Sequence, residues 1–232
     1  MEVKLLTSTT SIKDMEQFAA IAALTCHGNA DKEFVASEVL KRIIKAGHES
    51  VLEHITLTYS VKGLSRACLQ EVARHRHISL SVESTRHTLH KNVLRNIDNE
   101  FEIYCPIDIV YTQKCTIGDK AFPTLGEFCV GLIRDMAERY TDLSNDCMKY
   151  YLPEFWPTNL ILTSNIRELR HIIKLRTAPA ALKEFQELAH KLYDTVPEEY
   201  RYLLADCVYK FAPQEEVLGV EPADAAAFAE RN

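Results

Sequence analysis

The chain has 232 residues, of which 47% are hydrophobic and 26% are charged, as in a globular protein with a substantial core. Its 27 basic and 33 acidic residues give a net charge of -6, which argues against nonspecific binding to nucleic acid because that binding needs a basic surface. Seven cysteines without a C-x-x-C pair argue against a disulfide framework or a zinc ribbon. No signal-peptide core or membrane-spanning apolar run is present, so we expect a cytoplasmic protein that does not contact membranes.

The first third of the chain alternates predicted strands and helices. Residues 2–6 form a short predicted strand, and Ser11 begins a helix that ends at Gly28, with an apolar face of Met15, Phe18, Ala19 and Ala22. Asp31 is expected to cap a second helix, which Gly47 ends. Apolar residues alternate with polar ones over 55–62, which predicts a strand, and Ser65 is expected to cap the helix that follows.

The rest of the chain is predicted to be mainly helical. We expect a strand over 101–106, a loop over 112–122, and a long helix from Thr124 to about residue 151. Further helices are predicted over 164–176, after Pro179 and after Pro197. These elements predict one mostly helical α+β domain with a small antiparallel sheet over residues 1–212. The acidic, alanine-rich tail over 213–232 has little to bury, so we expect it to be flexible.

The most polar stretch of the chain runs from Glu71 to His87 and holds three arginines, three histidines and three serines. Arginine offers a planar fork of donors and serine adds a short donor, a combination that suits phosphate. A basic helix C-terminus would explain Arg74 and His75 through the helix dipole. It does not explain Ser84-Thr85-Arg86, which follows Arg76 at a predicted turn. The stretch therefore favours a nucleotide or another phosphorylated ligand.

A second concentration of charge lies on the helix predicted over 164–176. Arg167 and His171 are one helical turn apart and share a face, for which a solvated surface is the default explanation. Arg176 lies near the face of Leu169 and Ile173, so its guanidinium is expected to point toward buried surface and to need an anion. The same argument applies to Lys149, which stands between Met148 and two tyrosines.

Two other kinds of site are weaker interpretations. His75-x-His77, with four further histidines at 48, 54, 87 and 90, suggests a metal, but zinc needs three or four ligands and the cysteines are not spaced to help. We therefore predict no metal. Cys105 is a conceivable nucleophile, although a cysteine before proline in a strand is more often a small core residue. Glycine-rich phosphate loops are absent, so arginines, histidines and helix ends would have to hold a nucleotide cofactor.

The polar stretch also resembles a known signature. Arg74-His-Arg76, then seven residues, then Ser84, is similar to the R-H-R-x7-S motif of the flavin-dependent thymidylate synthases. The resemblance extends over about residues 10–210, with further matching segments at His48-Glu49-Ser50, Glu53-His54, Leu152-Pro153, Asn165-x-Arg167 and Leu175-Arg176. It implies the fold of that family and the methylation of dUMP to dTMP. It also implies 5,10-methylenetetrahydrofolate as one-carbon donor, a hydride from FAD that NADPH has reduced, and homotetramers with shared active sites.

The resemblance also implies roles for individual residues. It assigns FAD binding to Ser50, Arg74, His75, Arg76, Val82, Asn165, Arg167 and His171. It assigns dUMP binding to Glu71, Val72, Ala73, Arg74, Val82, Ser84, Thr85, Arg86, Lys149 and Arg176. Arg176 is the expected catalytic residue, stabilising negative charge as uracil N3 ionises, and His48 is a candidate on the folate and hydride side. The chain departs from the common motif at Ser81-Val82, where the family has Asn-Glu, at His87 in place of Tyr, and at His171 in place of Asn.

Two alternatives to this enzyme follow from the same residues. One is a nucleotide- or flavin-binding protein that has lost turnover, and the other is a metal-dependent hydrolase built on the histidines. A yellow purified protein would separate the flavoproteins from the hydrolase.

Overall fold

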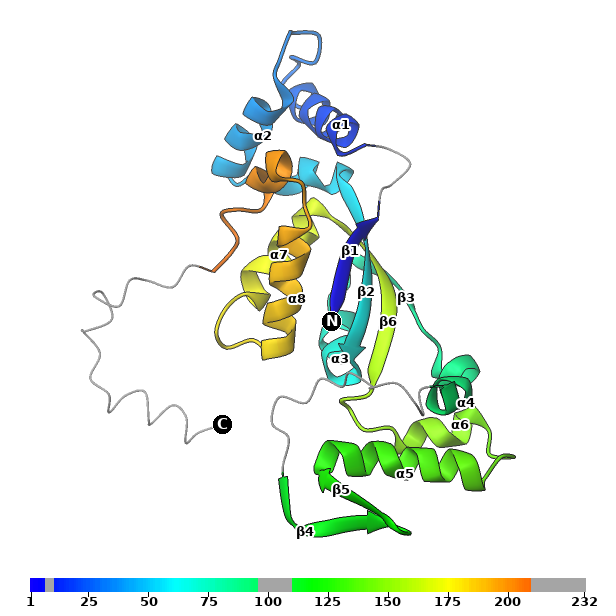
Figure 1. Cartoon of the computed structure of the whole chain (residues 1–232). Helices are drawn as coiled ribbons and strands as arrows, with labels where there is room; N and C mark the ends of the chain where they lie inside the picture. Colours follow the sequence, from blue (N-terminus) through cyan, green and yellow to red (C-terminus); the bar gives the residue numbers. More distant parts are fainter. Residues whose placement is uncertain (7–10, 96–109, 210–232) are drawn as a thin grey trace, which may run out of the picture.

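A computed structural model describes residues 1–6, 11–95 and 110–209 (Figure 1). A four-stranded antiparallel sheet forms the centre, in the order β1 (Glu2–Leu6), β2 (Thr56–Ser65), β6 (Pro157–Asn165) and β3 (Ile78–Val82). The strands predicted over 2–6 and 55–62 are confirmed. The strand β6 was not predicted, because Pro157 suggested only a helix break, yet its residues alternate between buried and more exposed positions along the whole strand.

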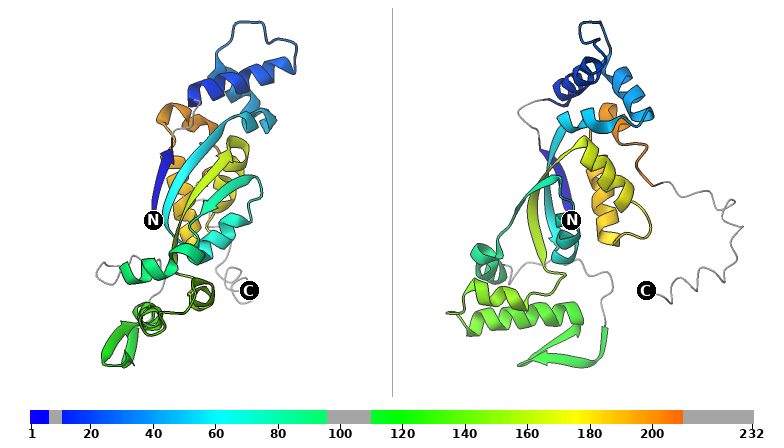
Figure 2. Two further views of the ribbon diagram at one scale, coloured as in Figure 1. Left: turned by 90° about the vertical axis from the view of Figure 1, so that its right-hand side faces the viewer. Right: turned by 180° about the vertical axis from the view of Figure 1, so that it is seen from behind.

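One face of the sheet is covered by helices. Figure 1 and the view from behind in Figure 2 place α7 (Ile166–Arg176) and α8 (Lys183–Asp194) together on that side, and α3 (Arg66–Ala73) contacts α8 and β2. These elements enclose the main hydrophobic core, in which Tyr59, Leu162, Ile173 and Phe185 are almost completely buried. The opposite face carries hydroxyl groups, among them Thr58 and Thr163, whose Oγ1 atoms lie 3.0 Å apart.

The helices near one end of the sheet differ in detail from the prediction. Ser11 caps α1 (Ile12–Thr25) as expected, accepting the Asp14 N–H at 3.1 Å, but Phe18 is 61% exposed and does not belong to the buried face. Small alanines at 19, 20 and 23 form that face beside Met15, which lets α1 pack closely on its neighbours. The second helix, α2 (Ala36–Lys45), begins at Ala36 with Val35 at its N-cap, so the prediction that Asp31 caps it was wrong. Residues 29–32 form a turn instead, in which Lys32 N–H donates to the Asn29 carbonyl.

Three short 3-10 helices complete the fold of the described residues. They are η1 (Glu49–His54), η2 (Lys149–Tyr151) and η3 (Glu198–Leu203). The segment around Ser50 forms η1, and a helix follows Pro197 as expected, although it is the 3-10 helix η3.

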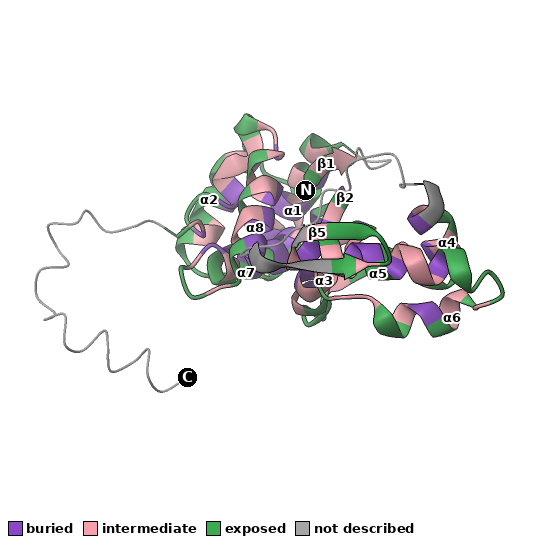
Figure 3. Ribbon diagram, turned by 60° about the horizontal axis from the view of Figure 1, so that its bottom comes forward, coloured by how far each residue is buried: buried purple, intermediate pink, exposed green. Residues whose placement is uncertain are grey.

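A second group of elements has its own hydrophobic cluster. It contains α4 (Thr85–Arg95), α5 (Leu125–Arg139), α6 (Asn145–Met148) and the hairpin of β4 (Val110–Ile117) and β5 (Lys120–Thr124). Figure 3 shows buried residues along these helices as well as around α8, and the second cluster includes Leu89, Val130, Ile133, Met148 and Trp156.

Two predictions in this region were wrong. The expected loop over 112–122 is the β4–β5 hairpin, which turns at Gly118 with a φ of 59°. The Phe122 ring of this hairpin packs directly on Gly131, and a Cβ atom at Gly131 would lie only 2.4 Å from the ring. The long helix expected to reach residue 151 ends at Arg139. Ser144 then accepts the Cys147 N–H and starts the separate helix α6. The strand expected over 101–106, with Cys105, and the tail over 213–232 lie outside the described residues.

None of the helices within the described ranges combines the length and the apolar character needed to span a bilayer.

Candidate active site

The strand β3 divides the polar stretch of residues 71–87 into two halves. Ile78 pairs with Ser164 and Val82 pairs with Leu160, so the strand runs along five residues of β6. At about 3.3 Å per residue, the two halves lie roughly 17 Å apart. Arg74, His75 and Arg76 come before the strand, whereas Ser84 and the start of α4 come after it. Residues that are neighbours in sequence therefore belong to two separate groups within one chain.

The first group surrounds Arg176, at the last turn of α7. The Arg176 Nη1 donates to Glu71 Oε2 at 3.0 Å, and its Nε donates to His75 Nε2 at 3.2 Å. The guanidinium also stacks 4.6 Å from the centre of the Phe185 ring. The Arg176 side chain is only 14% exposed, and Glu71 is the anion that we expected a guanidinium on this buried face to need. We call Glu71, His75, Glu168 and Arg176 the arginine cluster.

His75 is the buried centre of this cluster. Its Nδ1 lies 3.1 Å from Glu168 Oε1, while its Nε2 accepts from Arg176. Both bonds form together only when the ring is neutral and carries its proton on Nδ1, because a protonated ring has no acceptor. Burial lowers the pKa of His75, against the opposing hydrogen bond to Glu168, and the nearby Arg176 lowers it further. The neutral ring therefore orients the guanidinium.

The helix dipole by itself does not explain the pair Arg74-His75, because each side chain contacts a carboxylate. The Arg74 side chain is 75% exposed and its Nη1 lies 3.5 Å from Glu71 Oε1. The buried His75 instead connects α3 to Glu168, which is held at the start of α7 because its N–H donates to Asn165 Oδ1 at 2.8 Å. The N-cap of α7 thus positions the partner of His75.

The lowered pKa of His75 predicts a pH-dependent stability. A histidine whose folded-state pKa lies below its ordinary value of 6.5 binds fewer protons when folded than when unfolded, so stability falls as the pH falls through about 6.5. We expect the free energy of unfolding, measured with urea between about pH 8 and pH 5, to decrease over this range. His75→Gln should flatten the decrease. The exposed His190 gives the matched control His190→Gln, and an equal flattening in that variant would contradict the assignment to His75.

A cavity of about 690 Å³ opens beside the arginine cluster, between η1 and α7. Arg167, His171 and Lys174 line it from α7, so the shared face predicted for Arg167 and His171 is confirmed. The Arg167 Nη1 lies 2.6 Å from Glu53 Oε1 on η1. Lys174 forms no ion pair with any described residue, so its ammonium group is an unpaired cation at the edge of the cavity. The predicted site residues His48 and Ser50 are exposed and do not line this cavity.

Arg170 supports the floor of this cavity and was not assigned a role from the sequence. Its side chain is 5% exposed and reaches Glu49 at 3.0 Å, Asp206 at 2.6 Å and the Leu203 carbonyl at 2.6 Å. Burial opposes its charge, but the hydrogen bonds to Asp206 and Glu49 outweigh it and raise the pKa of Arg170. This residue joins η1, α7 and the segment after η3. The only sequence signal was its spacing of three residues from Arg167.

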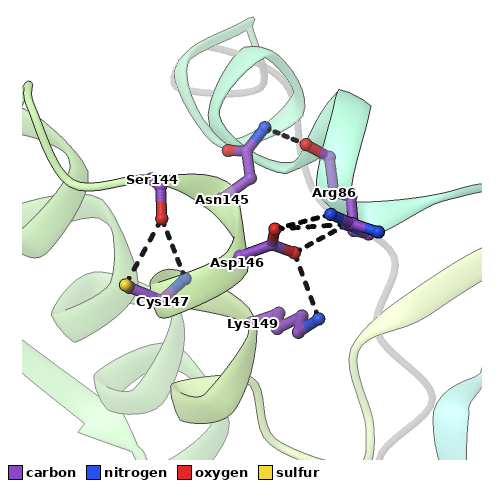
Figure 4. Close-up of polar contacts among 6 residues, drawn as sticks. All are labelled: Arg86, Ser144, Asn145, Asp146, Cys147 and Lys149. Carbon is purple, nitrogen blue, oxygen red and sulfur yellow. Dashed lines mark hydrogen bonds and ion pairs between the residues drawn. The ribbon is translucent and has the colours of Figure 1, made fainter.

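The second group lies at the start of α4, and Figure 4 shows its Arg86 and Lys149 together with Asp146. The Arg86 Nε lies 2.9 Å from Asp146 Oδ1 and its Nη2 donates to Asp146 Oδ2 at 3.0 Å. The Lys149 Nζ donates to Asp146 Oδ1 at 3.1 Å, so the anion expected for Lys149 is Asp146, three residues before it. The exposed Ser84 precedes α4, and its carbonyl accepts the His87 and Thr88 N–H groups, so the amides of Thr85 and Arg86 are the ones at the start of α4 without an acceptor among the described residues. We call Ser84, Thr85, Arg86 and Lys149 the α4 site.

The other residues that were predicted to bind ligands differ in how far they are exposed. The Val72 side chain is buried in the main core, whereas Ala73 and Arg76 are exposed at the end of α3. Val82 is 38% exposed at the end of β3, an edge strand. Among the described residues, no three His, Cys, Asp or Glu side chains gather closely enough to hold a metal ion.

Comparison with known proteins assigns this arrangement to a family. A family model described as "Thymidylate synthase complementing protein" matches residues 4–200. The flavin-dependent thymidylate synthase of Campylobacter jejuni (strain RM1221) is 38% identical over 188 residues, covering 80% of this chain and 84% of the relative. The chain belongs to the flavin-dependent thymidylate synthase family. The predicted family and enzyme class are therefore confirmed.

Other members of the family agree in sequence and in fold. The flavin-dependent thymidylate synthase of Helicobacter pylori (strain J99) is 34% identical over 166 residues, covering 69% of this chain and 76% of the relative. A crystal structure of thymidylate synthase X from Helicobacter pylori with FAD and dUMP has a TM-score of 0.69 and 29% identity, and it covers 90% of this chain and 100% of that one. The predicted α+β fold of a flavin-dependent thymidylate synthase is confirmed.

Several residues that build the site gave little signal in the sequence. Folding brings Glu168 to His75, Phe185 to Arg176 and Asp146 to Arg86. Glu168 had a usable signal, because it stands three residues after the capping residue Asn165. Asp146 is likewise three residues from Lys149, a spacing that favours an ion pair on a helix.

Proposed function

We propose that this enzyme methylates dUMP to dTMP, with 5,10-methylenetetrahydrofolate as the one-carbon donor and NADPH-reduced FAD as the hydride source. The observation that carries the proposal is the arginine cluster, in which a nearly buried Arg176 is oriented by Glu71 and His75. Family membership supports the reaction, and the related Helicobacter pylori enzyme was crystallised with FAD and dUMP. The Discussion gives the expected effect of removing this arginine.

The residues beside the cavity fit an anionic, planar cofactor. FAD carries a diphosphate, which needs cations, and Arg76 and Lys174 are exposed side chains without an ion-pair partner among the described residues. Arg74, Arg167, His171 and Asn165 would add donors around the same region. Bound FAD would supply the hydride once NADPH has reduced it. His75 would act indirectly, because both ring nitrogens already contact protein groups.

Arg176 would stabilise the pyrimidine as it becomes negatively charged. An arginine keeps its charge at any physiological pH, and a fixed cation in a site with little water stabilises developing charge by several kcal/mol. The bonds to Glu71 and His75 and the stacking on Phe185 restrict the guanidinium to one orientation. The protein would therefore need little reorganisation during the reaction.

The α4 site would hold the phosphate of dUMP. Arg86 and Lys149 are cations, Ser84 and Thr85 add hydroxyl donors, and the start of α4 adds backbone amides and the positive end of the helix dipole. These groups lie across β3 from Arg176 in the same chain. We therefore propose that a second copy completes each site within a homotetramer. We also propose that the enzyme is cytoplasmic, which the five free cysteines among the described residues support.

A direct assay tests the proposed reaction. Purified protein should be yellow from bound flavin, and it should release tritium from 5-tritiated dUMP only when NADPH and methylenetetrahydrofolate are both present. Flavin and dUMP binding without any release would favour the alternative of a binding protein without turnover.

Mixed oligomers test whether the sites are shared. We expect Arg176→Ala and Arg86→Ala each to be nearly inactive alone, because each removes one half of every site. Oligomers assembled from both variants should recover part of the activity, because some sites then combine two intact halves. Failure to recover activity, with mixed assembly verified by two different affinity tags, would place both halves of a site in one chain.

A further inference from the structure

One carboxylate already forms ion pairs with both cations of the α4 site. Asp146 bridges Arg86 and Lys149, with three of its contacts between 2.9 and 3.1 Å (Figure 4). Hydrogen bonds from Arg86 and then from Lys149 lower the pKa of Asp146, so it is ionised at neutral pH. The Asp146 side chain is 46% exposed and that of Arg86 is 64% exposed. Such exposed ion pairs contribute little to stability, so stability does not explain this arrangement.

The contacts of Asp146 are those that a phosphate would make. A guanidinium presents its fork to two carboxylate oxygens in the same way as to two phosphate oxygens. A lysine adds a third donor from the other side, and the amides at the start of α4 lie next to Arg86. A phosphate entering this site must therefore compete with a carboxylate that is part of the protein.

The surrounding contacts allow the carboxylate to leave while the backbone stays in place. Asn145 Nδ2 donates to the Arg86 carbonyl at 2.8 Å, and Asn145 Oδ1 accepts the His90 N–H at 3.0 Å, which ties α6 to α4. Ser144 caps α6 by accepting the Cys147 N–H at 3.3 Å. None of these bonds uses the Asp146 side chain. Releasing Asp146 is therefore a rotation of one side chain on a fixed frame.

We propose that Asp146 is an internal competitor for the substrate phosphate. In the free enzyme its carboxylate holds Arg86 and Lys149 in position, and on binding the phosphate of dUMP replaces it. This competition weakens the binding of dUMP and of the product dTMP alike, which favours release of the product. It leaves the binding of an uncharged deoxynucleoside unaffected, because such a ligand does not replace the carboxylate. The inference rests on the proposed function, and specifically on phosphate binding at the α4 site.

Neutralising Asp146 tests the proposal in the flavin-loaded enzyme. In Asp146→Asn, we expect dUMP and dTMP to bind about fivefold to tenfold more tightly by titration calorimetry, as the loss of two exposed competing ion pairs implies. Deoxyuridine should bind unchanged. The smaller Asp146→Ser should show the same direction. The matched control is Asp135→Asn, which removes a carboxylate that is 29% exposed and lies 2.8 Å from Arg139 on α5, and which should leave dUMP affinity as in the wild type.

Two results would overturn the proposal in distinguishable ways. If the wild type binds dUMP and Arg86→Ala weakens that binding, but both Asp146 variants bind dUMP equally or less tightly, then Asp146 only orients the cations. If dUMP binding is unaffected by Arg86→Ala, the phosphate does not occupy the α4 site. That second result would remove the proposed placement of dUMP together with the inference about Asp146.

Discussion

Arg176→Ala is expected to lower kcat/KM for dUMP about 10²- to 10³-fold while the protein stays yellow. The alanine removes a fixed cation from the place where the pyrimidine becomes negatively charged, and losing one such group costs roughly 3 to 4 kcal/mol of transition-state stabilisation. FAD should remain bound because the cations assigned to it, such as Lys174 and Arg167, are unchanged. Tritium release and flavin absorbance measure the two effects separately.

Two further variants distinguish a charge effect from a folding effect. Arg176→Lys keeps a positive charge but loses the paired bonds to Glu71 and His75, so we expect partial activity between alanine and wild type. Arg139→Ala removes an exposed arginine from α5 and should leave turnover unchanged. Near-wild-type turnover in Arg176→Ala would reject the assigned catalytic role.

Arg170→Met is expected to destabilise the protein by about 3 kcal/mol, near the lower end of the range for breaking a buried ion pair. The substitution leaves Glu49 and Asp206 without their cation and the Leu203 carbonyl without its donor. The loss stays moderate because Glu49 is 30% and Asp206 55% exposed, so water reaches both carboxylates. Thermal unfolding should show a decrease in Tm of roughly 6 to 12 °C.

The control for Arg170 is an exposed ion pair of similar chemistry. Arg139→Met removes the arginine that lies 2.8 Å from Asp135 on α5, and we expect a change within about 0.5 kcal/mol because exposed pairs contribute little. An equally small change in Arg170→Met would show that the buried network does not hold η1 and α7 together. Flavin retention in that variant would then report whether the cavity needs Arg170 directly.

Local sequence patterns predicted the elements whose signals are local. Ser11, Ser65 and Thr124 each accept an N–H three residues ahead at the start of a helix. Buried and more exposed residues alternate along most of β2, as its apolar and polar residues predicted. The same patterns failed where packing between distant segments decides the structure. The strand β6 needs β2 and β3 on its two sides, and the β4–β5 hairpin is held against α5 by Phe122 beside Gly131.

The sequence by itself determined the family and the residue types of the site. The R-H-R-x7-S signature and the apolar face of α7 were sufficient to select Arg176 and to show that it needed an anion. Only the tertiary structure decided which anions serve each cation, because Glu71, Asp206 and Asp146 approach Arg176, Arg170 and Arg86 through folding over 36 to 105 residues of separation. It also decided that β3, an extended strand, separates Arg74–Arg76 from Ser84–Arg86, since five residues in extended backbone cover about 17 Å.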